Sequence, residues 1–377
     1  MRVYVNGRFL TQPGSGVQRY ARSILDALDG MIGAAGPVEV LVPDAPLHDV
    51  PAWRNLSLRP VPGGQGHFWE QGALYRASRD GVLVSLGNSG PVRHRRQVLA
   101  LHDAHIYQIP QAFSWRYRAA HRVLRPRLAR RAAALVTVSR YSAGQLAGYL
   151  GVAEERFTVI PNAADHVFDW PADPSAPGRY GLQPGRYLLA VGNQSPNKNI
   201  RALVAAYGMA QGLPDLAVVG GSVPGVAADV PRGVRALGRV PDADLRGLYE
   251  GAAGFVFPSL FEGFGIPPLE AMALGVPVIA SNAAALPEVL GEAPIWFDPR
   301  DVGSMARALQ RFAGMSGTER SQRIAAGHAR AEAYGWERSA GLLFDVVARV
   351  ARSEALEQHI GGAGDLVGLR ADIADLP

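Results

Sequence analysis

Residues 254–281 read Gly254-Phe-Val-Phe-Pro-Ser-Leu-Phe-Glu-Gly-Phe-Gly-Ile-Pro-Pro-Leu-Glu-Ala-Met-Ala-Leu-Gly-Val-Pro-Val-Ile-Ala-Ser281. Two apolar runs, 254–257 and 277–280, flank a glycine-rich loop and a segment of helical spacing. A proline pair opens this helix, because the first helical turn needs no N–H donor there, and Gly275 is placed to end it. A strand, a loop, a helix and a second strand are the repeating unit of a parallel sheet covered by helices.

The same alternation continues in both directions along the chain. Further strands are predicted at 2–5, 38–42, 82–86, 97–101, 135–138, 158–160, 187–191, 217–219 and 233–237, and helices at 17–28, 116–134, 199–211, 242–251, 267–274 and 301–314. A stretch rich in proline and glycine, residues 169–186, predicts an interdomain linker. The sequence therefore predicts an α/β protein of two doubly wound domains, with ligands bound in a cleft at the carboxyl ends of the strands.

Composition excludes several classes of protein. The chain has 377 residues, of which 48% are hydrophobic and 19% charged, so neither a small module nor a disordered chain is expected. The absence of cysteine excludes disulfides, zinc–thiolate sites and thiol nucleophiles. No apolar run resembles a signal peptide or reaches the roughly 18 residues of a membrane span, so we expect a cytosolic protein.

Charge is unevenly distributed along the chain. Residues 1–170 carry 20 basic and 12 acidic side chains, whereas residues 171–377 carry 18 and 21. The basic half is expected to face an anionic partner, and a phosphorylated ligand, a lipid surface and nucleic acid all fit this asymmetry.

Within the basic half, residues 116–131 contain seven arginines and no acidic side chain. Phe113, Trp115 and Tyr117 lie beside them, and this mixture is typical of elements that bind anionic membranes. The predicted membrane contacts are Arg125, Arg127, Arg130 and Arg131. The alternatives are a solvated helix face or a nucleic-acid-binding face, although no known nucleic-acid module accompanies the segment.

Two loops that follow predicted strands carry residues suited to a sugar nucleotide. Lys198, the sole lysine among 38 basic residues, offers a compact positive charge for phosphate. The helix start beyond Glu262 can hold a phosphate, and the carboxylates of Glu262 and Glu270 can accept hydrogen bonds from sugar hydroxyls. Each feature also has a structural explanation, namely a solvated lysine and a loop–helix corner in which Glu270 favours the helix dipole.

Three weaker signals lie in the first half of the chain. Residues 14–19, Gly-Ser-Gly-Val-Gln-Arg, lack the third glycine of a dinucleotide fingerprint, so they form either a glycine loop that approaches a diphosphate or a plain turn. His102, after the strand at 97–101, is predicted either to bind substrate or to satisfy a structural hydrogen bond. Trp69 is predicted either to stack on an acceptor sugar or to lie in the core.

Together these segments resemble glycosyltransferase family 4, whose members are retaining enzymes of the GT-B fold. The most specific match is the pair Glu262 and Glu270, which corresponds to the E-x7-E motif of the family. Supporting matches are Gly14–Arg19, His102-Asp103, Val159–Asn162, Gly192–Lys198, Val219–Gly221, Gly238–Val240 and Tyr334–Glu337. Within the family, the chain is most similar to bacterial mannosyltransferase-like members that build O-antigen and exopolysaccharide.

The resemblance implies a role for each matching residue. Lys198 would contact the donor diphosphate, Glu262 the donor sugar hydroxyls and Glu270 the nucleotide ribose, and His102 would sit over the sugar near its anomeric centre. The other donor-binding residues that it implies are Gly14, Gly16, Asn193, Gly220, Arg239, Val240, Gly263, Phe264, Gly265 and Ile266. Many family members carry arginine at the position of Asn193, so the diphosphate here has one fewer cation, for which Arg19 is a candidate substitute.

The resemblance also implies the domain organisation. Residues 1–168 would form an acceptor-side domain, 169–186 a linker, 187–335 the nucleotide-sugar-binding domain, 336–352 a helix that crosses back, and 353–377 a tail. No metal and no other cofactor is expected, because the family needs no essential metal and Asp242-Ala-Asp244 is interpreted as a helix cap. Retention of anomeric configuration rests on the resemblance alone.

The predicted function is transfer of a hexose, mannose from GDP-mannose, to a lipid-linked or oligosaccharide acceptor in bacterial cell-surface polysaccharide synthesis. The alternatives are a UDP- or dTDP-sugar donor, a sugar-nucleotide epimerase of the same fold, and a non-catalytic sugar-nucleotide-binding subunit. The expected partners are the sugar nucleotide, the acceptor and an anionic membrane surface, without nucleic acid. The expected location is the cytoplasm, with peripheral attachment to the inner face of the plasma membrane.

Overall fold

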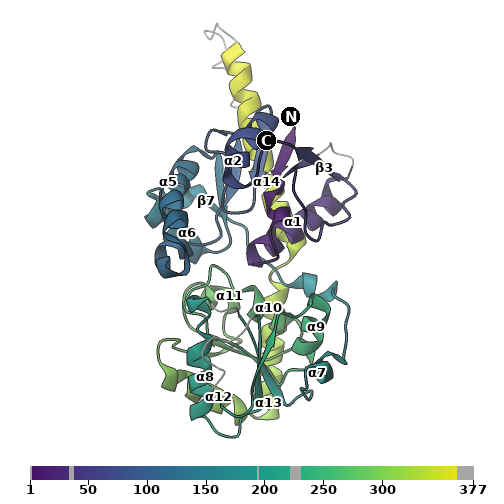
Figure 1. Cartoon of the computed structure of the whole chain (residues 1–377), viewed down its shortest axis with the longest axis vertical. Helices are drawn as coiled ribbons and strands as arrows, with labels where there is room; N and C mark the ends of the chain where they lie inside the picture. The colour runs from purple at the N-terminus through teal and green to yellow at the C-terminus, as the bar shows by residue number, and fades with distance from the viewer. Residues whose placement is uncertain (1, 34–37, 193–194, 221–230, 363–377) are drawn as a thin grey trace, which may run out of the picture.

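The structure is a computed structural model that describes residues 2–33, 38–192, 195–220 and 231–362. Two lobes are stacked along the long axis of the molecule, each built around a parallel sheet with helices on both faces (Figure 1). Strands such as β4 (Val82–Ser85) are buried at every position, as expected where helices cover both faces of a sheet. The predicted α/β architecture of two doubly wound domains is confirmed.

The N-terminal lobe contains a parallel sheet in the order β3-β2-β1-β4-β5-β6-β7. Its other strands are β1 (Val3–Asn6), β2 (Val38–Pro43), β3 (Leu56–Val61), β5 (Gln97–Ala100), β6 (Ala134–Thr137) and β7 (Phe157–Val159). Its helices and turns are η1 (Gly7–Thr11), α1 (Gly16–Ile32), α2 (Gly66–Trp69), η2 (Glu70–Leu74), α3 (Tyr75–Ser78), α4 (His105–Gln108), η3 (Pro110–Ala112), α5 (Trp115–Arg131), α6 (Arg140–Leu150), η4 (Glu154–Arg156) and η5 (Asp165–Phe168). The strand order reverses between β1 and β4, which makes this the topological switch point of the sheet.

The C-terminal lobe repeats this arrangement with the order β10-β9-β8-β11-β12-β13. Its strands are β8 (Tyr187–Val191), β9 (Asp215–Val219), β10 (Val234–Gly238), β11 (Gly254–Phe257), β12 (Val278–Ser281) and β13 (Ile295–Phe297). Its helices and turns are η6 (Pro196–Lys198), α8 (Ile200–Met209), α9 (Asp242–Glu250), α10 (Ile266–Ala273), α11 (Leu286–Leu290), α12 (Val302–Ala313) and α13 (Gly317–Glu332). The switch point of this sheet lies between β8 and β11.

Two connections join the lobes. One runs through the segment predicted as a linker and includes a short helix, α7 (Ala176–Arg179). The other is the long helix α14 (Trp336–Gly362), which rises from the C-terminal lobe along the N-terminal lobe (Figure 1). Leu343 and Val347 of α14 line an apolar cavity together with Val5 of β1 and Leu28 of α1. The helix therefore shares the hydrophobic core of the first lobe.

The lobes also touch directly beside the connections. Glu288 of α11 accepts hydrogen bonds from the backbone N–H groups of Arg140 and Tyr141, at 2.8 and 2.9 Å, and so places a carboxylate at the start of α6. Arg19 of α1 pairs with Asp242 of α9 at 3.0 Å. These contacts hold the carboxyl ends of both sheets face to face.

Three of the elements that were not predicted have a weak sequence pattern. The edge strand β3 has a half-exposed pattern and contains Pro60, both of which weaken a strand signal. The strand β13 is only three residues long. Helix α13 is polar on most of its surface and buries only Gly327 and Ala331, so it lacks the apolar stripe on which periodicity depends.

Candidate active site

Lys198 and Glu262 are brought together at the switch point of the C-terminal sheet. Lys198 ends η6 after β8, Glu262 lies in the loop after β11, and Lys198 Nζ donates to Glu262 Oε1 at 2.7 Å. The backbone N–H of Leu260 donates to Asn197 O at 2.7 Å, which ties the two loops to each other. The predicted juxtaposition of these loops follows from the adjacency of β8 and β11 in the sheet.

The ion pair is partly open to solvent. The side chains of Lys198 and Glu262 are 21% and 12% exposed, and Lys198 Nζ lies 5.2 Å from the ring centroid of Phe257. Gly192 packs against the aliphatic part of Lys198, where an added Cβ would come within 3.2 Å of the lysine Cβ. The stem of Lys198 is therefore fixed by packing against Gly192, while its ammonium stays partly exposed beside Glu262.

Gly263 contacts the N-terminal lobe directly. Its carbonyl accepts hydrogen bonds from Ser139 Oγ at 2.6 Å and Ser142 Oγ at 3.1 Å, both on the N-terminal lobe. A Cβ at this position would lie 2.5 Å from the carbonyl oxygen of His102, so only glycine allows this approach. Through Gly263, the loop that carries Glu262 lies against His102.

His102 is buried and fully oriented by its neighbours. Its Nε2–H donates to Leu86 O at 2.7 Å, its backbone N–H donates to Asn88 Oδ1 at 2.9 Å, and the Tyr20 ring lies edge-on at 4.7 Å. Burial lowers the pKa of His102, with the bond to Leu86 opposing it. The imidazole is therefore neutral near pH 7 with its proton on Nε2, which makes Nδ1 the hydrogen-bond acceptor of the ring.

Glu270 is buried on helix α10. It is the fifth residue of that helix, so it lies beyond the first turn, and it is 3% exposed. Its Oε1 accepts from His166 Nε2 at 2.9 Å and its Oε2 from Tyr249 Oη at 2.8 Å. Burial raises the pKa of Glu270, but the hydrogen bond from His166, the positive charge of Arg19 and the hydrogen bond from Tyr249 lower it overall. Glu270 is therefore a buried carboxylate that stays ionised.

The partners of Glu270 connect both lobes and the crossing helix. His166 belongs to η5 at the end of the N-terminal lobe, and its Nδ1 accepts from Trp336 Nε1, at the start of α14, at 3.0 Å. Neither His166 nor Tyr249 was among the residues predicted from the sequence. His166 and Glu270 are 104 positions apart, so no local pattern could have paired them.

The other residues assigned to the donor have varied surroundings. Gly16 begins α1 next to open space, and Gly14 precedes it in an exposed loop. Gly220 N donates to Gly238 O at 2.8 Å, and Arg239 and Val240 follow this pair. Asn193 lies outside the described residues. Arg19, the candidate substitute cation, pairs with Asp242 and lies 4.8 Å over the Trp170 ring, so its guanidinium is engaged at the lobe boundary.

The loop between Glu262 and α10 offers mainly its backbone. Phe264 and Ile266 are buried, and the Phe264 ring packs edge-on against Tyr334. Gly265 has a φ of 104° and a Cβ there would meet Leu286 at 2.5 Å, so glycine is required both by conformation and by space.

The structure corrects two predicted surface contacts. Trp69 is 0% exposed and its Nε1 donates to Val61 O at 2.7 Å, so the stacking hypothesis is wrong and the core alternative holds. Arg125 is 4% exposed and its Nη1 donates to Asp103 O at 3.2 Å, because it lies on the inner face of α5. Arg127, Arg130 and Arg131 are exposed on the same helix.

Neither a metal cluster nor a membrane-spanning helix occurs within the described ranges. Among these residues, no group of three or more His, Asp or Glu side chains could hold a metal ion. Nor does any helix in the same ranges have the length and apolarity needed to cross a membrane.

The chain is similar to known glycosyltransferases over both lobes. The family model described as Glycosyltransferase Family 4 matches residues 14–168, and that of Glycosyl transferases group 1 matches residues 185–314. The O-antigen chain mannosyltransferase B of Escherichia coli is 35% identical over 268 residues, which span 66% of this chain and 68% of that protein. The serotype-specific mannosyltransferase WbdA of Escherichia coli is 34% identical over 205 residues, 48% of this chain but only 24% of WbdA.

Similarity among solved structures extends over nearly the whole chain. WaaG, described as a glycosyltransferase involved in lipopolysaccharide biosynthesis, superposes with a TM-score of 0.68 at 16% identity, covering 92% of this chain and 99% of WaaG. At this identity the likeness concerns the fold, which is the GT-B fold in both proteins.

Proposed function

The chain belongs to glycosyltransferase family 4, and from this we propose that it transfers a mannosyl group from GDP-mannose, with retention, to a sugar-containing acceptor. Its place in bacterial O-antigen or related polysaccharide synthesis follows the functions named for its relatives. The observation that carries the proposal is the Lys198–Glu262 pair at one switch point, held against His102 of the other lobe by Gly263.

The reaction makes a specific demand on this site. The bond between the anomeric carbon and the diphosphate oxygen breaks, the acceptor oxygen bonds to the same carbon, and the proton of the acceptor hydroxyl passes to the departing diphosphate. The departing nucleoside diphosphate gains negative charge while the sugar passes through an oxocarbenium-like state. A preorganised cation and backbone amides stabilise such a leaving group. We assign these roles to Lys198 and to the amides around Gly263 and Gly265.

Glu262 and Glu270 would bind different parts of the donor. Glu262, which is partly exposed, would accept hydrogen bonds from donor sugar hydroxyls, with Lys198 shared between Glu262 and the diphosphate. A carboxylate can accept about four hydrogen bonds, and His166 and Tyr249 already donate two to Glu270. Glu270 would accept hydrogen bonds from the ribose hydroxyls through the remaining positions. Neutral His102 would contact the donor sugar near the anomeric centre as an acceptor through Nδ1. No metal has a part in this scheme.

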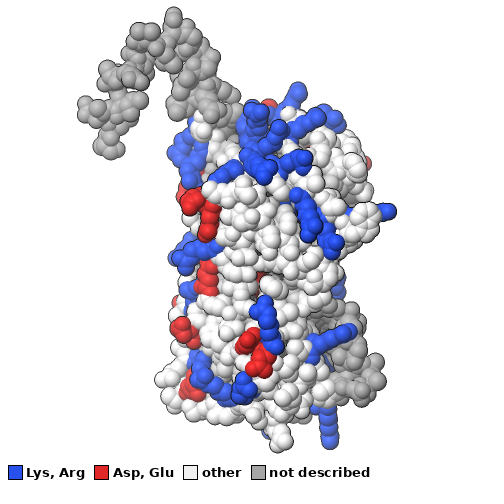
Figure 2. Space-filling model, turned by 90° about the vertical axis from the view of Figure 1, so that its left-hand side faces the viewer, with Lys and Arg blue, Asp and Glu red and all other residues white. Residues whose placement is uncertain are grey.

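We also propose that the acceptor is lipid-linked and that the protein attaches to the inner face of the plasma membrane. Trp115 and Val123 of α5 are 68% and 54% exposed, and exposed arginines lie on the same helix. Figure 2, which shows the face that carries α5 and α6, has basic side chains gathered over the N-terminal lobe. Exposed aromatic and basic side chains together favour an anionic lipid surface.

Donor turnover tests the function. Purified protein is incubated separately with GDP-mannose, UDP-glucose and dTDP-rhamnose, and free nucleoside diphosphate is measured with and without chelator. We expect GDP release from GDP-mannose that survives chelation. Conversion of the sugar nucleotide without release would indicate an epimerase, whereas binding without turnover would indicate a non-catalytic subunit. The anomeric configuration of a transfer product, read by NMR, tests retention.

A further inference from the structure

His166 is a buried histidine to which the proposed chemistry gives no role. It is 7% exposed and lies in η5, where the chain leaves the N-terminal lobe. Its Nε2 lies 2.9 Å from Glu270 Oε1, and its Nδ1 lies 3.0 Å from Trp336 Nε1. A single imidazole therefore joins α10 of the C-terminal lobe to the start of α14.

The proton of His166 is fixed by its two partners. The indole N–H of Trp336 can only donate, so His166 Nδ1 must accept, and the ring proton lies on Nε2. His166 Nε2–H therefore donates to Glu270. Without the indole N–H, the ring could carry its proton on Nδ1, and Nε2 would then be an acceptor facing a carboxylate. Trp336 thus determines, through His166, that Glu270 receives an N–H.

Trp336 is held by the segment that carries His166. Its backbone N–H donates to Asp165 Oδ2 at 3.1 Å. Ser339, in the first turn of α14, donates from its hydroxyl to Pro161 O at 2.8 Å. The first turn of α14 is thereby docked on the end of the N-terminal lobe, and the orientation of the His166 ring depends on that docking.

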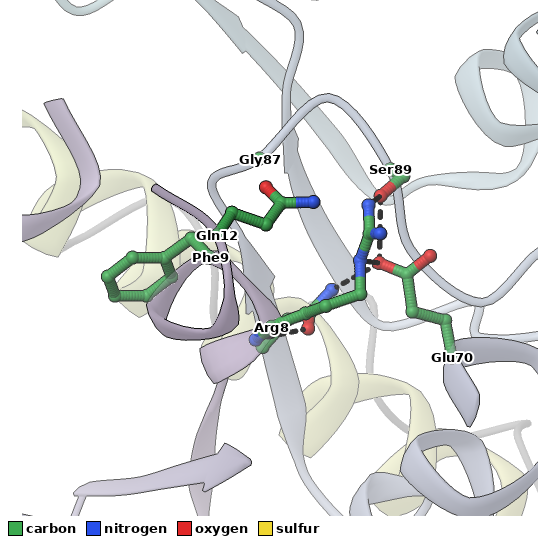
Figure 3. Close-up of a pocket in the computed structure, with 7 residues that line it drawn as sticks. Arg8, Phe9, Gln12, Glu70, Gly87 and Ser89 are labelled. Carbon is green, nitrogen blue, oxygen red and sulfur yellow. Dashed lines mark hydrogen bonds and ion pairs between the residues drawn. The ribbon is translucent and has the colours of Figure 1, made fainter. Parts of the chain in front are cut away.

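A second buried glutamate shows how a carboxylate is saturated by its neighbours. Glu70 is 0% exposed. Its Oε1 accepts from Asn6 Nδ2 at 2.9 Å, Arg8 Nε at 3.0 Å and Ser89 Oγ at 2.7 Å, and its Oε2 lies 2.8 Å from His67 Nδ1. Figure 3 shows Arg8 and Ser89 converging on this carboxylate. These contacts use about all the hydrogen bonds that a carboxylate can accept, so Glu70 is a structural group.

Glu270 is occupied only in part. The described residues donate one hydrogen bond to each of its oxygens, from His166 and from Tyr249 Oη. About one acceptor position on each oxygen is left. Both partners are neutral groups that donate once, whereas an arginine at the same place would bind both oxygens with its fork. The remaining positions match two hydroxyls on adjacent carbons, as in the 2′,3′-diol of a ribose.

We propose that His166 and Trp336 are positioning residues that make the donor site selective for ribonucleotides over 2′-deoxyribonucleotides. They hold Glu270 so that one position on each oxygen is open to one hydroxyl of the diol. A 2′-deoxyribose would leave one of these buried positions without a donor. The inference rests on the proposed function and deepens it, because it assigns the donor to the ribonucleoside diphosphate sugars and makes 2′-deoxyribonucleotide sugars poor substrates.

Two ligands that differ by one oxygen test this selection. The Kd values of GDP and 2′-deoxy-GDP are measured by calorimetry with the full chain. We expect the wild type to bind GDP about tenfold or more tightly than 2′-deoxy-GDP, as for one hydrogen bond to a charged acceptor. If GDP does not bind, UDP and 2′-deoxy-UDP are compared in the same way, because the selection concerns the ribose and not the base.

The variants should change the preference rather than binding in general. In Trp336→Phe and in His166→Leu, the affinity for GDP should fall while that for 2′-deoxy-GDP changes little, so that the two Kd values converge. A loss of packing alone would weaken both ligands equally. His166→Gln keeps an N–H donor and should preserve part of the preference. Trp336→Phe retains an aromatic ring and carries the test if His166→Leu does not fold.

Two matched variants control for the loss of an indole or a buried imidazole. Trp296→Phe changes a partly buried tryptophan of the C-terminal lobe. His94→Leu removes a histidine that is 3% exposed and whose Nε2 lies 3.0 Å from Ser78 O. Both variants should keep the wild-type ratio of the two Kd values.

Two results would overturn the inference. Equal Kd values for the two nucleotides in the wild type would remove the selection, and a wild-type ratio in both Trp336→Phe and His166→Leu would remove the positioning role. The proposed function fails in a different way. A protein that prefers GDP to 2′-deoxy-GDP but releases no nucleoside diphosphate from any sugar nucleotide would contradict transfer and leave the selection intact.

Discussion

Lys198 is the residue from which the proposed chemistry can be tested most simply. It is the sole lysine of the chain, and its Nζ is bonded to Glu262 in the absence of donor. We expect Lys198→Ala to lower kcat/KM for GDP-mannose hydrolysis by about 100- to 1000-fold, because a preorganised group that stabilises the leaving diphosphate is lost. Glu262→Ala should also lower turnover, with a loss in donor affinity.

The matched control removes an ion pair of the same lobe that has no proposed role. Arg307 pairs with Asp301 at 3.3 Å on the exposed surface of α12. Arg307→Ala should keep wild-type kinetics. Undiminished turnover in Lys198→Ala and Glu262→Ala, measured as release of GDP, would remove both residues from the site.

Gly263 provides a second residue-scale prediction. Gly263→Ala would place a Cβ 2.5 Å from the backbone oxygen of His102, which cannot move aside as a flexible side chain could. The lobes would have to separate there, so we expect at least a tenfold fall in kcat, as for a small misplacement of reacting groups. Gly317→Ala, at a helical glycine with open space around it, is the control for Tm and activity. Wild-type kcat in Gly263→Ala would show that this contact is dispensable.

At this scale the family resemblance assigned Lys198 and Glu262 to one donor, but the sequence did not predict their side-chain environment. The two loops meet because β8 and β11 are neighbours in the sheet. Trp69 and Arg125 were misplaced, since a residue's type does not reveal which face of its helix is buried when the helix has no strong apolar stripe.

Among the elements, helix α10 is linked to the start of α14 through Glu270 and His166, and this link should depend on pH. The pKa of Glu270 is lowered from 4.5, so the ionised form contributes stability above that value, and this is lost as pH falls through the native pKa. We expect Glu270→Gln to lower the free energy of unfolding by about 1–3 kcal/mol near neutral pH. The difference in Tm between wild type and variant should shrink below about pH 4. A difference that is constant with pH would contradict the ionised network.

Helix α5 should determine attachment to lipid. Each exposed arginine near an anionic membrane is worth about 1 kcal/mol, so Arg130→Gln with Arg131→Gln should weaken binding to vesicles containing anionic phosphatidylglycerol by about tenfold or more. Added salt should weaken wild-type binding in the same direction. The control pair is Arg307→Gln with Arg311→Gln on α12 of the other lobe. If both double variants sediment with the vesicles to the same extent, α5 has no role in lipid attachment.

The elements themselves were predicted where their patterns are strong. Each strand predicted from an apolar run is present, with ends displaced by at most two residues, because strands buried on both faces leave a continuous signal. Helix α14 runs to Gly362 rather than to residue 352, since nothing in the polar stretch beyond residue 350 prevents a helix from continuing. The half-exposed edge strand β3 and the three-residue edge strand β13 carried too little pattern to be found.

For the molecule as a whole, alternation of strands and helices predicted two doubly wound lobes, but not how they face each other. That arrangement depends on a few contacts across the boundary, such as Glu288 with the start of α6 and Gly263 with Ser139. These bonds form between segments more than a hundred positions apart. Only the folded chain brings the two switch points together.

A crystal structure of the protein with GDP-mannose would show whether Lys198 and Glu262 bind the donor. We expect electron density for the nucleotide between the lobes, with a diphosphate oxygen within hydrogen-bond distance of Lys198 Nζ and a mannose hydroxyl at Glu262. Density on another surface, or density in the cleft that leaves both Lys198 and Glu262 untouched, would contradict these assignments.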